Sequence, residues 1–200
     1  MKPLNTPERR LNTVLDVLFW LLIARGIFAA GHHCLALYGL FTDPAASTGT
    51  MGLTIDWLTL EAENGFGVNS GDLISMKLVH LVSAIALTAI SCRGILVLKR
   101  ILLPIEGGQP FRAGISGELT SLGRCAFWLG MAENLSMLAI VILIENHYQL
   151  PNLLLGNAIT GVSIHPQFRP AWFIAAAVLT ILAMVFRRGE QLQQLSDETL

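Results

Sequence analysis

Four apolar segments, each long enough to cross a bilayer, constrain the fold of this chain more than any other feature. They cover residues 13–40, 71–103, 117–147 and 170–188. A hydrocarbon core of about 30 Å needs roughly 20 helical residues. Apolar residues make up 53% of the 200 positions and charged residues only 14%. In lipid, a helix pairs its own backbone polar groups, so the sequence predicts an all-α membrane protein, a four-transmembrane-helix bundle forming a single domain over residues 1–200.

The basic residues are unevenly distributed around these segments. Ten of the thirteen precede the first segment, surround the second connection or follow the fourth segment: Lys2, Arg9, Arg10, Arg93, Lys99, Arg100, Arg112, Arg124, Arg187 and Arg188. By the positive-inside rule, this predicts that both termini are cytoplasmic and that the connections at about 41–70 and 148–169 lie outside. Gathering at segment ends, these charges form no continuous basic face, which argues against direct nucleic-acid binding.

The two outer connections carry weak strand patterns. Residues 52–60 alternate partly at period two, and residues 159–164 are rich in β-branched side chains. Together they predict a small extracytoplasmic β-strand pair.

Two opposite charges fall at a similar depth inside the predicted membrane. Arg25 lies fifteen residues from Leu40 on the first segment, and Glu133 lies thirteen residues from Asn146 on the third. An unpaired charge there costs at least ~2.5 kcal/mol on insertion scales, so we expect the two to form a buried ion pair. Such a pair either fixes the order of the helices or provides a polar centre for a ligand or a proton.

Histidines extend this polar line outward. His32 follows Arg25 by seven residues, so the two share a helix face. His80 falls at the level of His32 on the second segment. Arg25, His32, His80 and Glu133 are therefore the candidate binding residues of an inward polar seam. The histidines all lie toward the predicted outer side: His32, His33, His80, His147 and His165.

Imidazoles at these positions have the chemistry to bind zinc, copper or haem iron. The chain has no H-E-x-x-H motif, no cysteine cluster and no histidine pair at i, i+4. We therefore predict interfacial histidines, with no metal ligands, no catalytic residues and no cofactor. A metal- or haem-binding membrane oxidoreductase is kept as an alternative.

A second charged level, formed by Asp16, Arg93 and Arg124, falls near the predicted cytoplasmic boundary. Long basic side chains at this level reach the interface with their charged ends. We interpret the three residues as structural or topological.

Small residues on two segments predict close helix packing. Gly26, Ala30 and Gly31 lie on the first segment, while Gly123 and Gly130 are seven residues apart on the third. Residues of this size allow helix backbones to approach one another in a membrane.

Glycine and proline interrupt the chain between the second and third segments, in the stretch "PIEGGQPFRAG" at 104–114. This composition ends a helix and begins a turn. Gly108, Pro110 and Phe111 are candidate partner-binding residues here, with Phe111 docking either on the bundle or on a partner.

The C-terminal stretch "FRRGEQLQQLSDETL" begins with a basic helix end and spaces Leu192 and Leu195 three residues apart. This pattern is typical of a short amphipathic helix. Arg188 and Gly189 complete the candidate partner surface. The tail either contacts a partner or lies on the membrane.

The chain resembles a group of small bacterial four-helix membrane proteins, the domain of unknown function 2975 family. The resemblance rests on the four-segment layout, on "GGQPF" at 107–111 and on "FRRGEQL" at 186–192. It implies a location in the bacterial cytoplasmic membrane and no established activity. It also implies a cytoplasmic protein partner such as a helix-turn-helix regulator, because the genes of the family often lie beside one.

These observations lead to three functional hypotheses. The first is a non-enzymatic regulatory or accessory protein, embedded in the lipid bilayer, that acts through a partner. The second is the membrane oxidoreductase described above. The third is a small transporter subunit, which would need a homo-oligomer because four helices enclose only a thin pathway.

Overall fold

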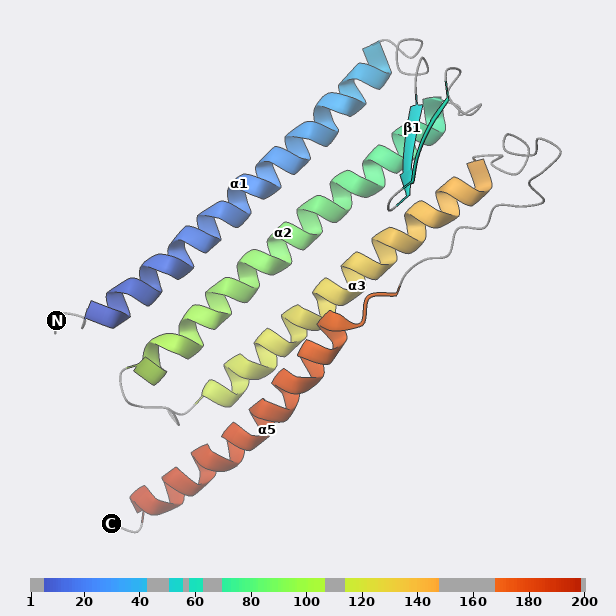
Figure 1. Cartoon of the computed structure of the whole chain (residues 1–200). Coiled ribbons are helices and arrows are strands. Elements are labelled where there is room, and N and C mark those ends of the chain that lie inside the picture. Colours follow the sequence, from blue (N-terminus) through green and yellow to red (C-terminus); the bar gives the residue numbers. More distant parts are fainter. Residues whose placement is uncertain are drawn as a thin grey trace. The chain divides into compact units, whose positions relative to one another are not determined.

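The computed structural model describes residues 6–42, 51–55, 58–62, 70–106, 114–147 and 168–198. Within these ranges the chain forms four helices and one hairpin, in the order shown in Figure 1. The elements are α1 (Thr6–Thr42), β1 (Met51–Ile55), β2 (Leu58–Ala62), α2 (Ser70–Glu106), α3 (Ile115–His147) and α5 (Ala171–Glu198).

Each of these four helices is long and apolar enough to cross a membrane. The apolar stretches are Leu11–Thr42, Leu73–Leu102, Ile115–Leu143 and Ala171–Leu195. They overlap the four predicted segments and confirm the prediction of four helices with the length and composition to cross a membrane. The clearest difference is at the C-terminal end, where α5 continues to Glu198 although the predicted span ends at Arg188.

Large apolar side chains cover the outside of the helices. Phe28 is 79% exposed, Trp20 is 65% exposed and Ile181 is 57% exposed. In water, a contiguous surface of this kind would drive association. In a bilayer the same surface contacts lipid chains, so the exposed side chains fit a multi-pass membrane protein.

The chain divides into two compact units. Unit 1 comprises Met1–Ile27, Ala86–Glu133 and Arg169–Leu200, and unit 2 comprises Phe28–Ile85 and Asn134–Phe168. Helices α1, α2 and α3 each contribute residues to both units, whereas α5 belongs to unit 1. The units are described separately below.

The core of unit 1 lies where α2, α3 and α5 meet. Its buried side chains are Val97, Ile101, Ile115, Leu119 and Ala183, with Leu122, Leu179 and Phe186 packed against them. These residues recur at helical spacing on each helix, so that one apolar stripe of each faces the others.

Two glycines on α3 allow α5 to approach closely, as their spacing predicted. A Cβ atom at Gly130 would lie 3.0 Å from the Cβ of Trp172 and 3.1 Å from the ring of Phe173. A Cβ atom at Gly123 would lie 3.4 Å from the carbonyl oxygen of Ala176. The missing side chains therefore set the distance between the two helices.

Helix α1 packs on α2 through a similar contact. A Cβ atom at Gly26 would overlap the side chain of Thr88. Nearer the N-terminus of α1, the carboxylate of Asp16 accepts a hydrogen bond from the ammonium group of Lys99 on α2. A small residue and an ion pair thus join these two helices within unit 1.

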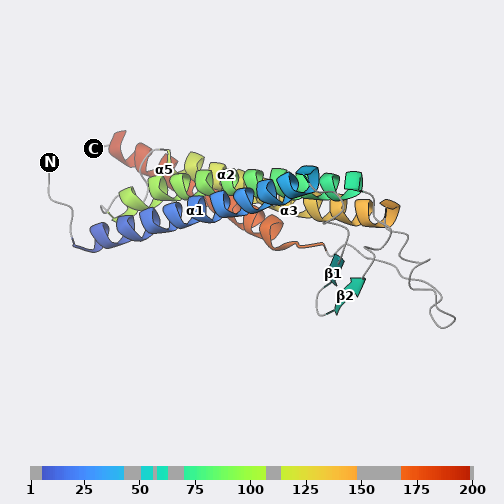
Figure 2. The same cartoon turned by 90° about the horizontal axis from the view of Figure 1, so that it is seen from above.

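In unit 2, β1 and β2 form an antiparallel pair (Figure 2). Met51 is opposite Ala62 and Ile55 is opposite Leu58. The stretch 52–60, predicted to pair with 159–164, instead contributes residues to two strands that pair with each other. The second predicted strand, at 159–164, lies outside the described residues.

We expect Gly130→Ala to destabilise the protein, because the added methyl group would meet Trp172 and Phe173 at 3.0 to 3.2 Å. Overpacking of this kind costs about 1 to 3 kcal/mol. The measurement is the midpoint of thermal unfolding in mild detergent. Gly117→Ala, on the same helix, is the matched control, since an added Cβ at Gly117 meets nothing within 4 Å. Equal midpoints for the two variants would contradict the close α3–α5 contact.

Candidate functional site

The four residues predicted to form an inward polar seam divide between the two units. Arg25 and Glu133 belong to unit 1, and His32 and His80 belong to unit 2. Each pair is therefore considered within its own unit.

Glu133 pairs with a residue other than the one predicted. Its Oε1 lies 2.7 Å from Nη1 of Arg169, which directly precedes Pro170 and the start of α5. Arg25 is exposed on α1 and makes no ion pair among the residues that the structure describes. The expected Arg25–Glu133 pair is thus replaced by Arg169–Glu133. Counting residues along a helix estimates depth, but it gives no information about which neighbour a side chain faces.

The histidine contact also differs from the predicted one. The ring of His80 on α2 stacks on His33 of α1, with centroids 5.4 Å apart and planes 5° from parallel. His32, the predicted seam residue, is exposed and meets His33 edge-on at 5.5 Å. Adjacent residues on a helix point about 100° apart, so only one of the two can face α2.

The stacked rings leave one polar atom without a partner. Nδ1 of His33 is buried and has no hydrogen bond within the described part of the chain. Among these residues, no three His, Cys, Asp or Glu side chains are grouped to hold a metal ion. The histidine pair therefore offers two imidazoles from two helices.

The predicted partner surface is described only in part. Gly108, Pro110 and Phe111 lie outside the described residues. Arg188 and Gly189 lie on α5, where Arg188 is exposed. Helix α5 passes through both without interruption, so the predicted amphipathic tail is a continuation of the apolar helix.

A charged side chain fixes this tail to the beginning of α3. Glu190 accepts two hydrogen bonds from Ser116, one from the backbone N–H at 2.8 Å and one from the hydroxyl at 2.8 Å. Gly114 directly precedes α3 with a φ of 100°, a conformation that favours glycine. A carboxylate at this position satisfies a free N–H of the first helical turn and interacts favourably with the helix dipole.

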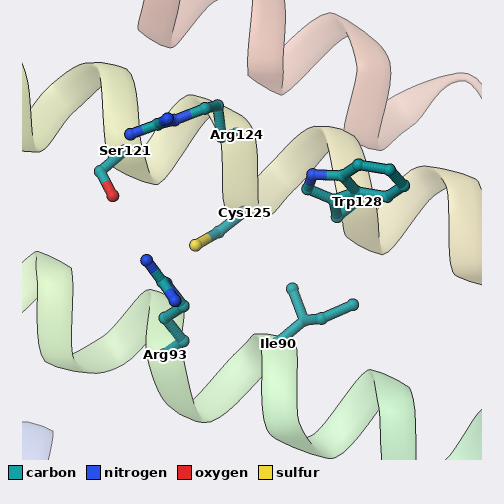
Figure 3. A pocket seen from close by; sticks show the side chains of 6 residues that line it. All are labelled: Ile90, Arg93, Ser121, Arg124, Cys125 and Trp128. Carbon is teal, nitrogen blue, oxygen red and sulfur yellow. The ribbon is translucent and has the colours of Figure 1, made fainter.

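Unit 1 also contains a cavity of about 330 Å³ between α2 and α3. Its lining residues are Ile90, Arg93, Ser121, Arg124, Cys125 and Trp128. Figure 3 shows Arg93 reaching from α2 toward Ser121 and Cys125, while Arg124 extends along α3 on the side of Ser121. Trp128 and Ile90 form the apolar end. Two guanidinium groups therefore border one cavity inside the apolar spans.

Sequence reasoning placed these two arginines at one level but interpreted them as structural. Next to the cavity, α2 packs on α3 at Gly94, where an added Cβ would make an ordinary contact of 4.0 Å with Cys125 and with Leu122. In the sequence, the signal for this contact is a glycine directly after Arg93 and a cysteine directly after Arg124. Arg93 and Arg124 thus line the same cavity from neighbouring helices.

Comparisons with protein-family models, curated proteins and solved structures found no match for this chain.

We expect a double-mutant cycle to show coupling between Glu133 and Arg169. Glu133→Gln and Arg169→Gln should each lower the unfolding midpoint in detergent, and the double variant should lose less than the sum. Because the side chain of Arg169 is 60% exposed and that of Glu133 is 26% exposed, solvent screening limits the coupling to about 0.5 to 1 kcal/mol.

The matched cycle replaces Arg169→Gln with Arg25→Gln. It should be additive with Glu133→Gln, since those two side chains form no ion pair within the described ranges. Coupling in the Arg25 cycle and additivity in the Arg169 cycle would contradict the Arg169–Glu133 pair and favour the Arg25–Glu133 pair.

Proposed function

We propose that the protein is a non-enzymatic regulatory or accessory protein of the membrane, which acts by presenting the C-terminal part of α5 to a cytoplasmic protein partner. The observation that carries this proposal is the attachment of the exposed tail of α5 to α3 through Glu190 and Ser116.

The tail has the composition of a helical recognition surface. Leu192 is 69% exposed and Leu195 is 60% exposed. Three residues apart on one helix, they share a face. Their neighbours Gln191, Gln193 and Gln194 are also exposed. An amphipathic helix with apolar anchors at this spacing suits a groove on a partner protein.

The hydrogen bonds to Ser116 make the tail a defined surface. Ser116 is buried, with 7% of its surface exposed, and Glu190 precedes Leu192 by half a helical turn. A helix held at this point presents its leucines in one orientation, which reduces the ordering cost that a partner must overcome on binding.

The predicted topology supports a cytoplasmic location for this surface, because Arg187 and Arg188 lie at the end of the fourth predicted segment. Membership of the domain of unknown function 2975 family, and with it a helix-turn-helix regulator as the partner in a bacterial cytoplasmic membrane, is part of this proposal. Its support is the pair of motifs at 107–111 and 186–192.

A photo-crosslinking amino acid at position 192 or 195, introduced in cells that naturally make the protein, tests the proposal. We expect both positions to crosslink to the same cytoplasmic protein, identified by mass spectrometry. Leu192→Glu should reduce recovery of that protein by about tenfold or more, as for an interface anchor. Gln193→Glu, which adds the same charge on another face of the tail, is the matched control. Crosslinks to lipid alone would show instead that the tail lies on the membrane.

A further inference from the structure

The two cavity arginines differ from Lys99 and Arg100, the next basic residues along α2, in having no acidic partner among the described residues. Lys99 pairs with Asp16, and Arg100 lies 3.7 Å from Glu118. Arg93 and Arg124 have no acidic partner in the described ranges, although both lie inside apolar spans. An ionisable residue within a membrane-spanning segment is a candidate functional residue by default.

The cavity offers hydrogen-bond donors and almost no acceptors. Each guanidinium carries five N–H donors and no acceptor, and the Trp128 indole is a donor only. The Ser121 hydroxyl can donate as well, and none of the lining residues that the structure describes carries a carboxylate. A ligand that satisfies this lining must supply several oxygen acceptors and negative charge.

Phosphate esters meet this requirement better than carboxylates. A phosphate group presents several charged or partly charged oxygens, and guanidinium groups bind it through paired hydrogen bonds. Arg93 and Arg124 come from different helices, so a ligand between them needs oxygens in more than one direction. The apolar end formed by Ile90 and Trp128 would contact the carbon chain that a phosphate ester carries.

We infer that this cavity binds the phosphate group of an anionic phosphate ester, with Arg93 and Arg124 as its charged ligands. Its position inside the apolar spans favours a phospholipid as the source, since basic pockets between membrane helices hold anionic headgroups. The site lies between α2 and α3, and it is separate from the partner surface on the tail of α5.

The test uses the full chain, purified and delipidated in a neutral detergent. Thermal unfolding is followed while phosphatidylglycerol, phosphatidylcholine with the same acyl chains, or sodium phosphate at constant ionic strength is added. We expect saturable stabilisation by phosphatidylglycerol with at least about tenfold higher apparent affinity than phosphatidylcholine. Arg93→Gln with Arg124→Gln should remove this preference, because hydrogen bonds to charged groups account for about tenfold each.

Two control variants separate a specific site from general attraction to charge. Arg187→Gln removes an exposed positive charge on α5, which does not line the cavity, and it should keep the full preference. Arg93→Lys with Arg124→Lys retains the charge without the planar fork and should keep part of it. The lysine variant and each single glutamine variant also test the site if the double glutamine variant fails to fold.

Each outcome bears on the proposal. Stabilisation by sodium phosphate alone, with the same dependence on the two arginines, supports the phosphate site and assigns it to a soluble ester. Equal affinity for the two lipids would overturn the inference. A preference that survives the double glutamine variant, or falls equally in Arg187→Gln, would also overturn it.

Discussion

The close approach of α5 to α3 at Gly130 and Gly123 is the contact on which the arrangement of unit 1 depends. Membrane helices gain little from hydrophobic burial against one another, because lipid is as apolar as their side chains. Van der Waals contact between small residues therefore has to hold the pair together. The ion pair of Glu133 with Arg169 and the hydrogen bonds of Ser116 to Glu190 follow from it, since both can form only when α5 lies in one register along α3.

This register has consequences at both ends of α5. At its beginning, Arg169 is brought to the side of Glu133, so a residue assigned to a connection by sequence pairs with a charge on a transmembrane helix. At its other end, α5 continues past the predicted span, which ends at Arg188, and carries the exposed Leu192 and Leu195. A helix that was free at this end would not hold Leu192 and Leu195 in a fixed direction.

The charges of unit 1 fall into two groups with different physical roles. Asp16 with Lys99, and Glu118 with Arg100, neutralise one another between neighbouring helices. Arg93 and Arg124 instead share a cavity with hydrogen-bond donors. Ion pairs of the first kind fix helix positions with only a modest gain in stability. Two positive charges that line one cavity favour the binding of an anion. The proposed partner surface thus depends on the tail of α5, and the proposed phosphate site depends on the two arginines of α2 and α3.

Sequence alone determined the four apolar spans, because the length of an apolar stretch is a local property. That length decides whether a helix can cross the hydrocarbon core of a bilayer. It also indicated Gly123 and Gly130 as packing positions, since residue size is equally local. Only the tertiary structure decided the partner of Glu133, the choice of His33 over His32 against His80, and the shared cavity of Arg93 and Arg124. Each depends on the rotation of one helix relative to its neighbour, and residue spacing along a single helix does not contain that angle.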